Sequence, residues 1–118
     1  MYEYNTMAKP QHRTYSRQNL EALELLAQAI RAGRIGRKIT IREMANRAGI
    51  SRSLLQRIED GDQSCAIGAV FEAAVIAGVS LFEAEPDHLQ AHRAALTEKL
   101  SLLPQAARKP RRVIRDDF

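Results

Sequence analysis

The chain has 118 residues, of which 45% are apolar and 27% charged, a balance typical of one globular domain rather than of a disordered chain. Aromatic residues make up 5% and tryptophan is missing, so a core must consist of aliphatic side chains, which favours packed helices. Lys and Arg outnumber Asp and Glu by 18 to 14, and this excess of positive charge suggests a polyanionic partner.

Several classes of protein are not expected. The longest apolar run, Ala73–Val79, is much shorter than the roughly 20 residues that cross a bilayer. The first residues carry no hydrophobic signal segment. Cys65 is the single cysteine, so the chain can form neither an internal disulfide nor a cysteine metal cluster. These features predict a cytoplasmic protein without a membrane partner.

The charged residues are sorted along the chain. Residues 31–57 hold eight basic side chains and one acidic one, whereas residues 59–98 hold eight acidic side chains and one basic one. The sequence after Pro104 is basic again. A chain sorted in this way can present one face to a phosphate backbone and turn another away from it, although solvated helix faces also carry charge.

Residues 1–16 are polar and without periodicity, and they predict a flexible N-terminal arm in which Met7 is an alternative first residue. A first helix is expected from Arg17, because apolar residues recur there at helical spacing. They are Leu20, Leu23, Ala27 and Ile30. Gly33 and Gly36 are expected to weaken this helix and then to end it.

A second helix is predicted over residues 41–48. Thr40 can cap its first turn, and Glu43 follows at the spacing of a capping box. Ile39 and Met44 occupy the two positions that form a hydrophobic staple. The alternation of Ile39 and Ile41 would also fit a short strand, but the cap signals favour the helix.

A third helix is predicted after Gly49, with Ser51 as its N-cap and Gly61 at its end. Its apolar face consists of Leu54, Leu55 and Ile58. Its polar face consists of Arg52, Ser53, Gln56, Arg57 and Asp60. Two helices joined by a short break, with basic and polar residues exposed on the second, have the arrangement of a helix-turn-helix.

A fourth helix is predicted over residues 66–77. Apart from Glu72 it carries no charge, and it is apolar nearly all round, which is typical of a helix that is covered on both sides. The second cover is either another subunit, which would make this helix the contact of a homodimer, or the core of the domain itself.

Two further helices and a tail complete the chain. Residues 80–83 show another capping-box pattern and are expected to begin a short fifth helix. Pro86 suits the first turn of a sixth helix over residues 86–103, and residues 104–118 predict a flexible basic tail. One side of the sixth helix is lined by Leu89, Leu96, Leu100 and Leu103.

The stretch from Thr40 to Gly61, TIREMANRAGISRSLLQRIEDG, resembles the lambda-repressor-like, or Xre, family. The similarity extends over residues 20–82 and includes the spacing of Ala45, Gly49, Ser51, Ile58, Glu59 and Gly61. It implies an all-α protein: a five-helix lambda-repressor-like DNA-binding domain at residues 17–85, whose third helix enters the major groove, followed by an extra C-terminal helix.

The residue types on the third helix suit base recognition. Arg52 and Arg57 can each offer two donors to guanine, Gln56 can pair with adenine, and Ser53 is small enough to let the helix approach. Arg42, with two basic residues before it, is placed to meet phosphate near a helix N-terminus. The predicted DNA-binding residues are Arg37, Lys38, Arg42, Ser51, Arg52, Ser53, Gln56 and Arg57.

The comparison with the family pattern gives one difference and one expected ion pair. Many members of the family carry Gln or Ser at the first position of the second helix, where this chain has Ile41, so one backbone contact is not expected here. The family often pairs an Arg late in the first helix with the Glu that ends the third. This pattern implies an ion pair between Arg34 and Glu59 and a structural role for Arg34.

The segment CAIGAVFEAAVIAGVSLFEAE, with the leucine-rich helix and the basic tail ending RDDF, resembles the HipB-like antitoxins. That resemblance implies a homodimer that represses its own operon and binds a HipA-like serine/threonine kinase toxin. The basic tail would then contact the kinase, the DNA or both. Phe118, an aromatic residue with a free carboxylate, is either an anchor in a partner pocket or simply the end of the tail.

The leading hypothesis is thus a sequence-specific repressor of double-stranded DNA that is also the antitoxin of a kinase. The alternatives are a stand-alone Xre-type regulator, a protein-interaction module that has lost DNA binding, and an enzyme. His88 and His92 have metal-ligand spacing, but HLQAH lacks the Glu of the zinc-protease motif. We therefore expect no enzymatic activity, cofactor or metal.

Overall fold

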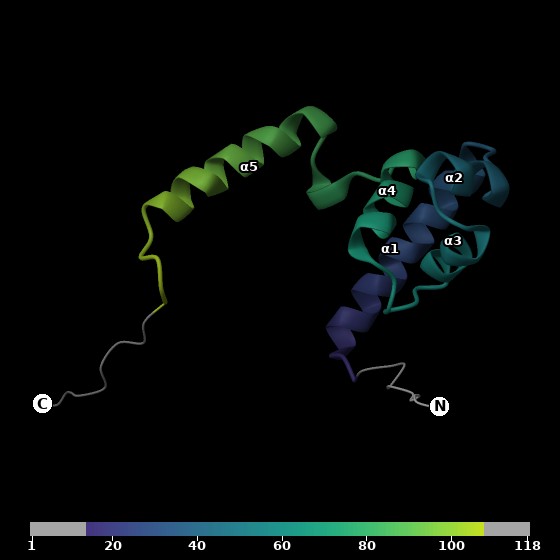
Figure 1. Cartoon of the computed structure of the whole chain (residues 1–118), viewed down its shortest axis with the longest axis horizontal. Helices are drawn as coiled ribbons and strands as arrows, with labels where there is room; N and C mark the ends of the chain where they lie inside the picture. Colours follow the sequence, from purple (N-terminus) through teal and green to yellow (C-terminus); the bar gives the residue numbers. More distant parts are fainter. Residues whose placement is uncertain (1–13, 108–118) are drawn as a thin grey trace, which may run out of the picture. The chain divides into compact units, whose positions relative to one another are not determined.

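The computed structural model describes residues 14–107, and every regular element in that range is helical (Figure 1). The chain is therefore an all-α protein, as the sequence predicted. The helices are α1 (Arg17–Gly36), α2 (Ile41–Ala48), α3 (Arg52–Glu59), α4 (Ile67–Ala77), the single 3-10 turn η1 (Leu81–Glu83) and α5 (Pro86–Ser101). The chain divides into two compact units between Glu83 and Ala84, so that α1 to α4 and η1 form one unit and α5 belongs to the other.

The first three helices begin where a side chain can cap them. The Ser16 and Ser51 hydroxyls accept hydrogen bonds from the first turns of α1 and α3. Thr40 and Glu43 form the reciprocal capping box that the sequence predicted. Gly49 takes the left-handed conformation, with φ of 70°, and ends α2. The predicted bounds of α2 are confirmed, and the strand alternative is wrong.

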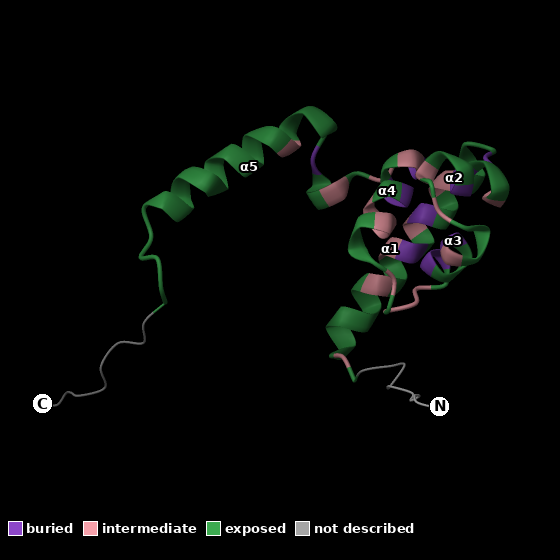
Figure 2. Ribbon diagram, viewed as in Figure 1, coloured by how far each residue is buried: buried purple, intermediate pink, exposed green. Residues whose placement is uncertain are grey.

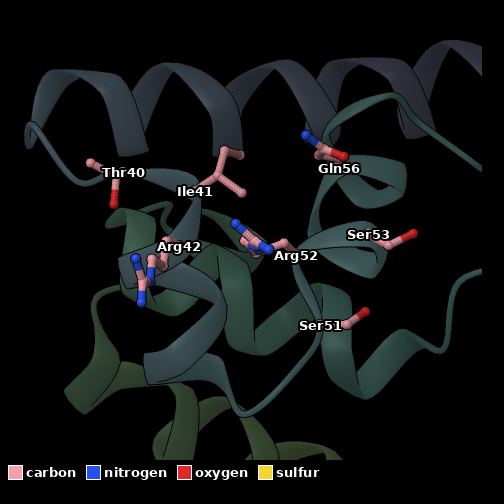
Figure 3. A pocket seen from close by; sticks show the side chains of 7 residues that line it. All are labelled: Thr40, Ile41, Arg42, Ser51, Arg52, Ser53 and Gln56. Carbon is pink, nitrogen blue, oxygen red and sulfur yellow. The ribbon is translucent and has the colours of Figure 1, made fainter.

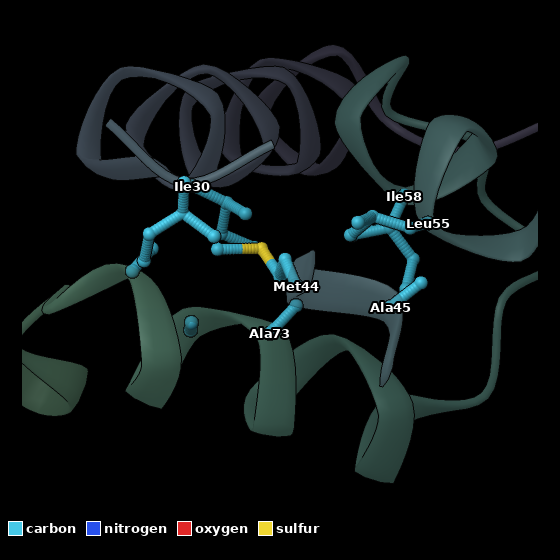
Figure 4. Close-up of a cluster of buried hydrophobic side chains, with 9 residues drawn as sticks. Ile30, Met44, Ala45, Leu55, Ile58 and Ala73 are labelled. Atoms are coloured by element: carbon cyan, nitrogen blue, oxygen red, sulfur yellow. The ribbon is translucent and has the colours of Figure 1, made fainter. Parts of the chain in front are cut away.

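The core lies where α1, α2, α3 and α4 converge (Figures 2 and 4). Ile30, Met44 and Leu55 are the largest fully buried side chains. Met44 lies between Ile30 of α1 and Ala73 of α4 in Figure 4, while Leu55 belongs to the face of α3 that turns inward. Ile39 is also in this core cluster, so both members of the predicted staple are buried.

Gly33 lies inside α1, and the helix ends at Gly36, as the sequence predicted. A Cβ added at Gly33 would collide with the carbonyl oxygen of Ala77 and would lie 3.1 Å from its carbonyl carbon. Glycine is therefore needed at this position because α1 and α4 approach closely here. Gly36 is the last residue of α1 and has open space around it.

Arg34 and Glu59 form the ion pair that the resemblance implied. Arg34 Nε and Nη2 donate to the two Glu59 carboxylate oxygens at 2.7 and 3.0 Å. Arg34 Nη1 donates to the carbonyl oxygen of Ile39 at 3.0 Å. One guanidinium thus joins α1, α3 and the loop before α2. The side chains of Arg34 and Glu59 are only 12% and 5% exposed, so the pair lies within the protein interior.

The predicted fifth and sixth helices need correction. Residues 81–83 form one 3-10 turn instead of an α-helix, because Phe82 and Glu83 take positive φ values of 56° and 54° that end regular winding. The last helix, α5, ends at Ser101 and not at Leu103. None of its residues is buried, so its leucine-lined side does not contribute to a core within the described chain (Figure 2).

Removing one partner of the buried pair should destabilise the protein strongly. Glu59→Gln leaves the Arg34 charge uncompensated in the interior, and we expect the free energy of unfolding in urea to fall by about 3–5 kcal/mol. Arg17→Ala is the matched control, because the Arg17–Glu21 pair is 91% and 69% exposed and should contribute less than about 1 kcal/mol. Equal losses in the two variants would contradict a structural role for Arg34.

The close approach of α1 and α4 predicts opposite effects for two glycine substitutions. Gly33→Ala should lower the free energy of unfolding by about 1–3 kcal/mol, because the collision is with backbone atoms that cannot move aside. Gly36→Ala should leave stability unchanged or raise it by about 0.5–1 kcal/mol, since alanine favours the helix. Thermal unfolding followed by circular dichroism measures both, and a neutral Gly33→Ala variant would refute the packing argument.

Candidate nucleic-acid interface

A surface groove of about 660 Å³ lies between the N-terminal ends of α2 and α3 (Figure 3). It is lined by Thr40, Ile41, Arg42, Ser51, Arg52, Ser53 and Gln56. Five of the eight predicted DNA-binding residues therefore come together in one place, although they derive from two helices. We call this set of lining residues the α2–α3 groove.

The register of α3 explains why these side chains face outward. Leu55, Ile58 and Glu59 are the buried residues of this eight-residue helix. With 3.6 residues per turn, fixing these three inside places Ser53 and Arg57 on the opposite side and Arg52 and Gln56 on one flank. All four are exposed, so the face that the sequence predicted to be polar is open to solvent.

The groove is electropositive for two physical reasons. Its lining holds the guanidinium groups of Arg42 and Arg52 and contains no carboxylate. In addition, the N-caps Thr40 and Ser51 both line it, so the partially positive N-terminal ends of two helices flank the same groove. An anion at this position would meet fixed charges of one sign.

The nearest acidic side chain on α2, Glu43, is engaged in the capping box. The backbone N–H of Thr40 donates to Glu43 Oε1 at 2.9 Å, and this bond, together with the Thr40 hydroxyl, lowers the pKa of Glu43. Its negative charge therefore serves the helix start and remains ionised at neutral pH.

Ile41 and Asn46 extend the site in ways the sequence prediction did not include. Ile41 lines the α2–α3 groove and gives it apolar surface. Asn46 lines an adjoining groove together with Arg42 and Arg52. Its place on α2, four residues after Arg42, was the only signal in the sequence that could have identified it.

Arg37 and Lys38 lie outside the α2–α3 groove. Arg37 follows the last turn of α1, and its Nη1 donates to the carbonyl oxygen of Ile76 at 3.1 Å, near the C-terminal end of α4. Lys38 continues the turn with a positive φ of 59°. The Arg37 guanidinium thus contacts a helix end, and phosphate binding by these two residues stays a prediction.

Arg57 also lies outside the groove, although its side chain is exposed. Its Nε donates to Asp62 Oδ2 at 3.0 Å, and its Nη2 donates to Ser64 Oγ at 2.8 Å. The donors of Arg57 are therefore partly occupied by the loop that follows α3. Phe118, the predicted partner-binding residue, is outside the described residues.

Within residues 14–107 no group of three or more His, Cys, Asp or Glu side chains could hold a metal ion. His88 and His92 are exposed on α5. Burial, followed by the charge of Asp62, raises the pKa of the Cys65 thiol, which keeps it protonated and weakly nucleophilic at neutral pH.

Comparison of the chain with protein-family models, with curated proteins and with solved structures gives no match. Among the described residues, no helix combines the length and the apolar character that a membrane span requires. The functional assignment therefore depends on the residues and on the geometry of the α2–α3 groove.

Proposed function

We propose that the protein is a sequence-specific repressor that binds double-stranded DNA through α3. The observation that supports this best is the α2–α3 groove, in which Arg42, Arg52 and Gln56 are exposed beside two helix N-termini and away from any lining carboxylate. This combination suits a polyanion whose bases also offer donors and acceptors.

In this proposal, α3 lies in the major groove. An eight-residue helix is about 12 Å long and fits a groove about 12 Å wide. Arg52 then offers two donors to guanine O6 and N7, and Gln56 pairs with adenine N6 and N7. Arg42, on α2, meets the phosphate backbone and orients the protein without reading sequence.

The separation of charge along the chain supports the same orientation. Residues 31–57 supply the basic side chains around α2 and α3, whereas the sequence from Glu59 to Glu98 is predominantly acidic. The acidic segments would be repelled by phosphate, so only one face of the domain can approach DNA closely. A protein-interaction module that had lost DNA binding would not need this bias.

We further propose that the protein acts in the cytoplasm as a homodimer and as the antitoxin of a HipA-like serine/threonine kinase. The resemblance of residues 65–118 to the HipB-like antitoxins supports the kinase partner. A stand-alone Xre-type regulator is the alternative. A kinase-like gene beside this one, and co-purification of its product with the protein, would favour the antitoxin.

Three arginine variants test the DNA-binding proposal. Arg52→Ala should weaken binding to a selected duplex by about 1–3 kcal/mol and relax the choice at one base pair. Arg42→Ala should weaken binding to all duplexes alike and reduce the dependence of affinity on salt. Arg17→Ala, which removes an exposed arginine from the start of α1, should change neither.

Fluorescence anisotropy at several salt concentrations measures these effects, after selection of duplexes from a random library by the parent protein. Absence of salt-dependent binding to any duplex would refute the proposed function. Binding that Arg17→Ala weakens as much as Arg52→Ala would instead show that charge alone, and not the α2–α3 groove, is responsible.

The homodimer is expected to form through the exposed apolar residues of α4. Ile67 and Val75 on α4 are 69% and 59% exposed, and burial of such residues against a second copy would stabilise a dimer. Ile67→Glu should raise the dimer dissociation constant in analytical ultracentrifugation at least about tenfold. Leu25→Glu places the same charge at a residue that is 68% exposed on α1 and should have no effect. A monomeric parent protein would exclude this contact.

A further inference from the structure

The loop after α3 holds Arg57 by both its side chain and its main chain. In addition to the two side-chain bonds with Asp62 and Ser64, the backbone N–H of Asp62 donates to the carbonyl oxygen of Arg57 at 3.0 Å. Gly61, at φ 79°, turns the chain so that Asp62 comes back alongside the helix. We call Arg57, Asp62 and Ser64 the arginine clamp.

The two acceptors of the clamp occupy one edge of the guanidinium. The Ser64 hydroxyl and the Ser64 backbone N–H donate to Asp62 Oδ1 at 2.6 and 2.8 Å, so the hydroxyl and the carboxylate lie side by side. They accept from Nε and from the neighbouring Nη2 of Arg57. A guanidinium carries five N–H groups in one plane, one on Nε and two on each Nη. The two bonds use the Nε hydrogen and one Nη2 hydrogen. The other Nη2 hydrogen and the Nη1 hydrogens, at the far end of the guanidinium, can therefore donate to another pair of acceptors.

The clamp keeps its charge and its geometry at neutral pH. The bonds from the Ser64 hydroxyl and N–H, followed by the bond from Arg57, hold the pKa of Asp62 far below its usual range. The Arg57 side chain is still 47% exposed, so the ion pair contributes little to stability. Its main physical effect is to fix the direction of a long, flexible side chain before any ligand binds.

We propose that Asp62 and Ser64 are positioning residues, which present the far end of the Arg57 guanidinium to O6 and N7 of a guanine and so determine the choice at one base pair. This inference depends on the proposed role of α3 in the major groove. Arg52 provides the contrast, because its guanidinium makes no ion pair or hydrogen bond with any residue in the range 14–107. A clamped arginine discriminates more sharply between bases, since it cannot turn to an alternative acceptor.

The opposite role is that the clamp withholds Arg57 from DNA. The two roles predict different results when the clamp is broken. If Asp62 positions Arg57, its loss weakens the preference for guanine at one position. If Asp62 withholds Arg57, its loss strengthens that preference and creates a contact that the parent protein lacks.

The experiment is selection from a library of 30-base-pair duplexes of random sequence, followed by sequencing, with four variants of the full chain. In Asp62→Ala, the guanine enrichment at one position of each half-site should fall about fivefold or more relative to the parent, as it should in Arg57→Ala. Asp60→Ala is the matched control, because it removes an exposed carboxylate from the end of the same helix. It should leave the enrichment unchanged while strengthening binding to all duplexes slightly.

Ser64→Ala keeps the Asp62 carboxylate and removes one acceptor, so it should give a smaller loss and decides the question if Asp62→Ala does not fold. A second measurement does not need DNA. The Arg57 Nε–H signal in an ¹H–¹⁵N spectrum should be distinct from that of free arginine in the parent and in Asp60→Ala, and should move to the free position in Asp62→Ala.

The outcomes separate the inference from the proposed function. If the parent selects no duplex, the proposed function fails and this inference fails with it. If the parent selects a sequence but Asp62→Ala and Ser64→Ala keep or raise its guanine enrichment, the positioning role is wrong and the function stands. Loss of the preference in Asp60→Ala as well would attribute the effect to charge rather than to the clamp.

Discussion

The buried ion pair between Arg34 and Glu59 is the constraint on which the arrangement of the first unit depends. Two opposite charges in a poorly solvated interior must face each other, because neither has water to replace its partner. The pair therefore fixes the rotation of α3 about its own axis relative to α1. With Leu55, Ile58 and Glu59 facing inward, the helical repeat places Ser53 and Arg57 on the outward side, while Arg52 and Gln56 lie on an exposed flank.

Arginines that look equivalent in the sequence have different physical roles in the structure. Arg34 is an interior ion-pair partner, Arg37 contacts the end of α4, and Arg57 is clamped by the loop after α3. Arg42 and Arg52 line the α2–α3 groove. The arginines of one basic segment thus have different partners, and the buried Arg34 is the one whose charge is not available to a polyanion.

Local signals in the sequence did not by themselves specify three features of the fold. Gly33 has the low helix propensity of any glycine, yet α1 continues through it because the approach of α4 requires a residue without a Cβ. The capping-box pattern at residues 80–83 produced one 3-10 turn instead of a longer helix, since two successive residues of η1 adopt positive φ values. Periodicity placed leucines along one side of α5 but could not show whether anything covers them.

The sequence by itself determined the helix starts, the break at Gly49, the inward face of α3 and the Arg34–Glu59 pair. Caps, breakers and periodicity act within a few residues, and the pair followed from a family pattern. Only the tertiary structure decided which partners the individual arginines contact. Arg37 is separated from its partner Ile76 by 39 residues, and Arg57 meets Asp62 only because Gly61 turns the chain. The Arg37–Ile76 contact depends on how α1 and α4 pack, which no local pattern specifies.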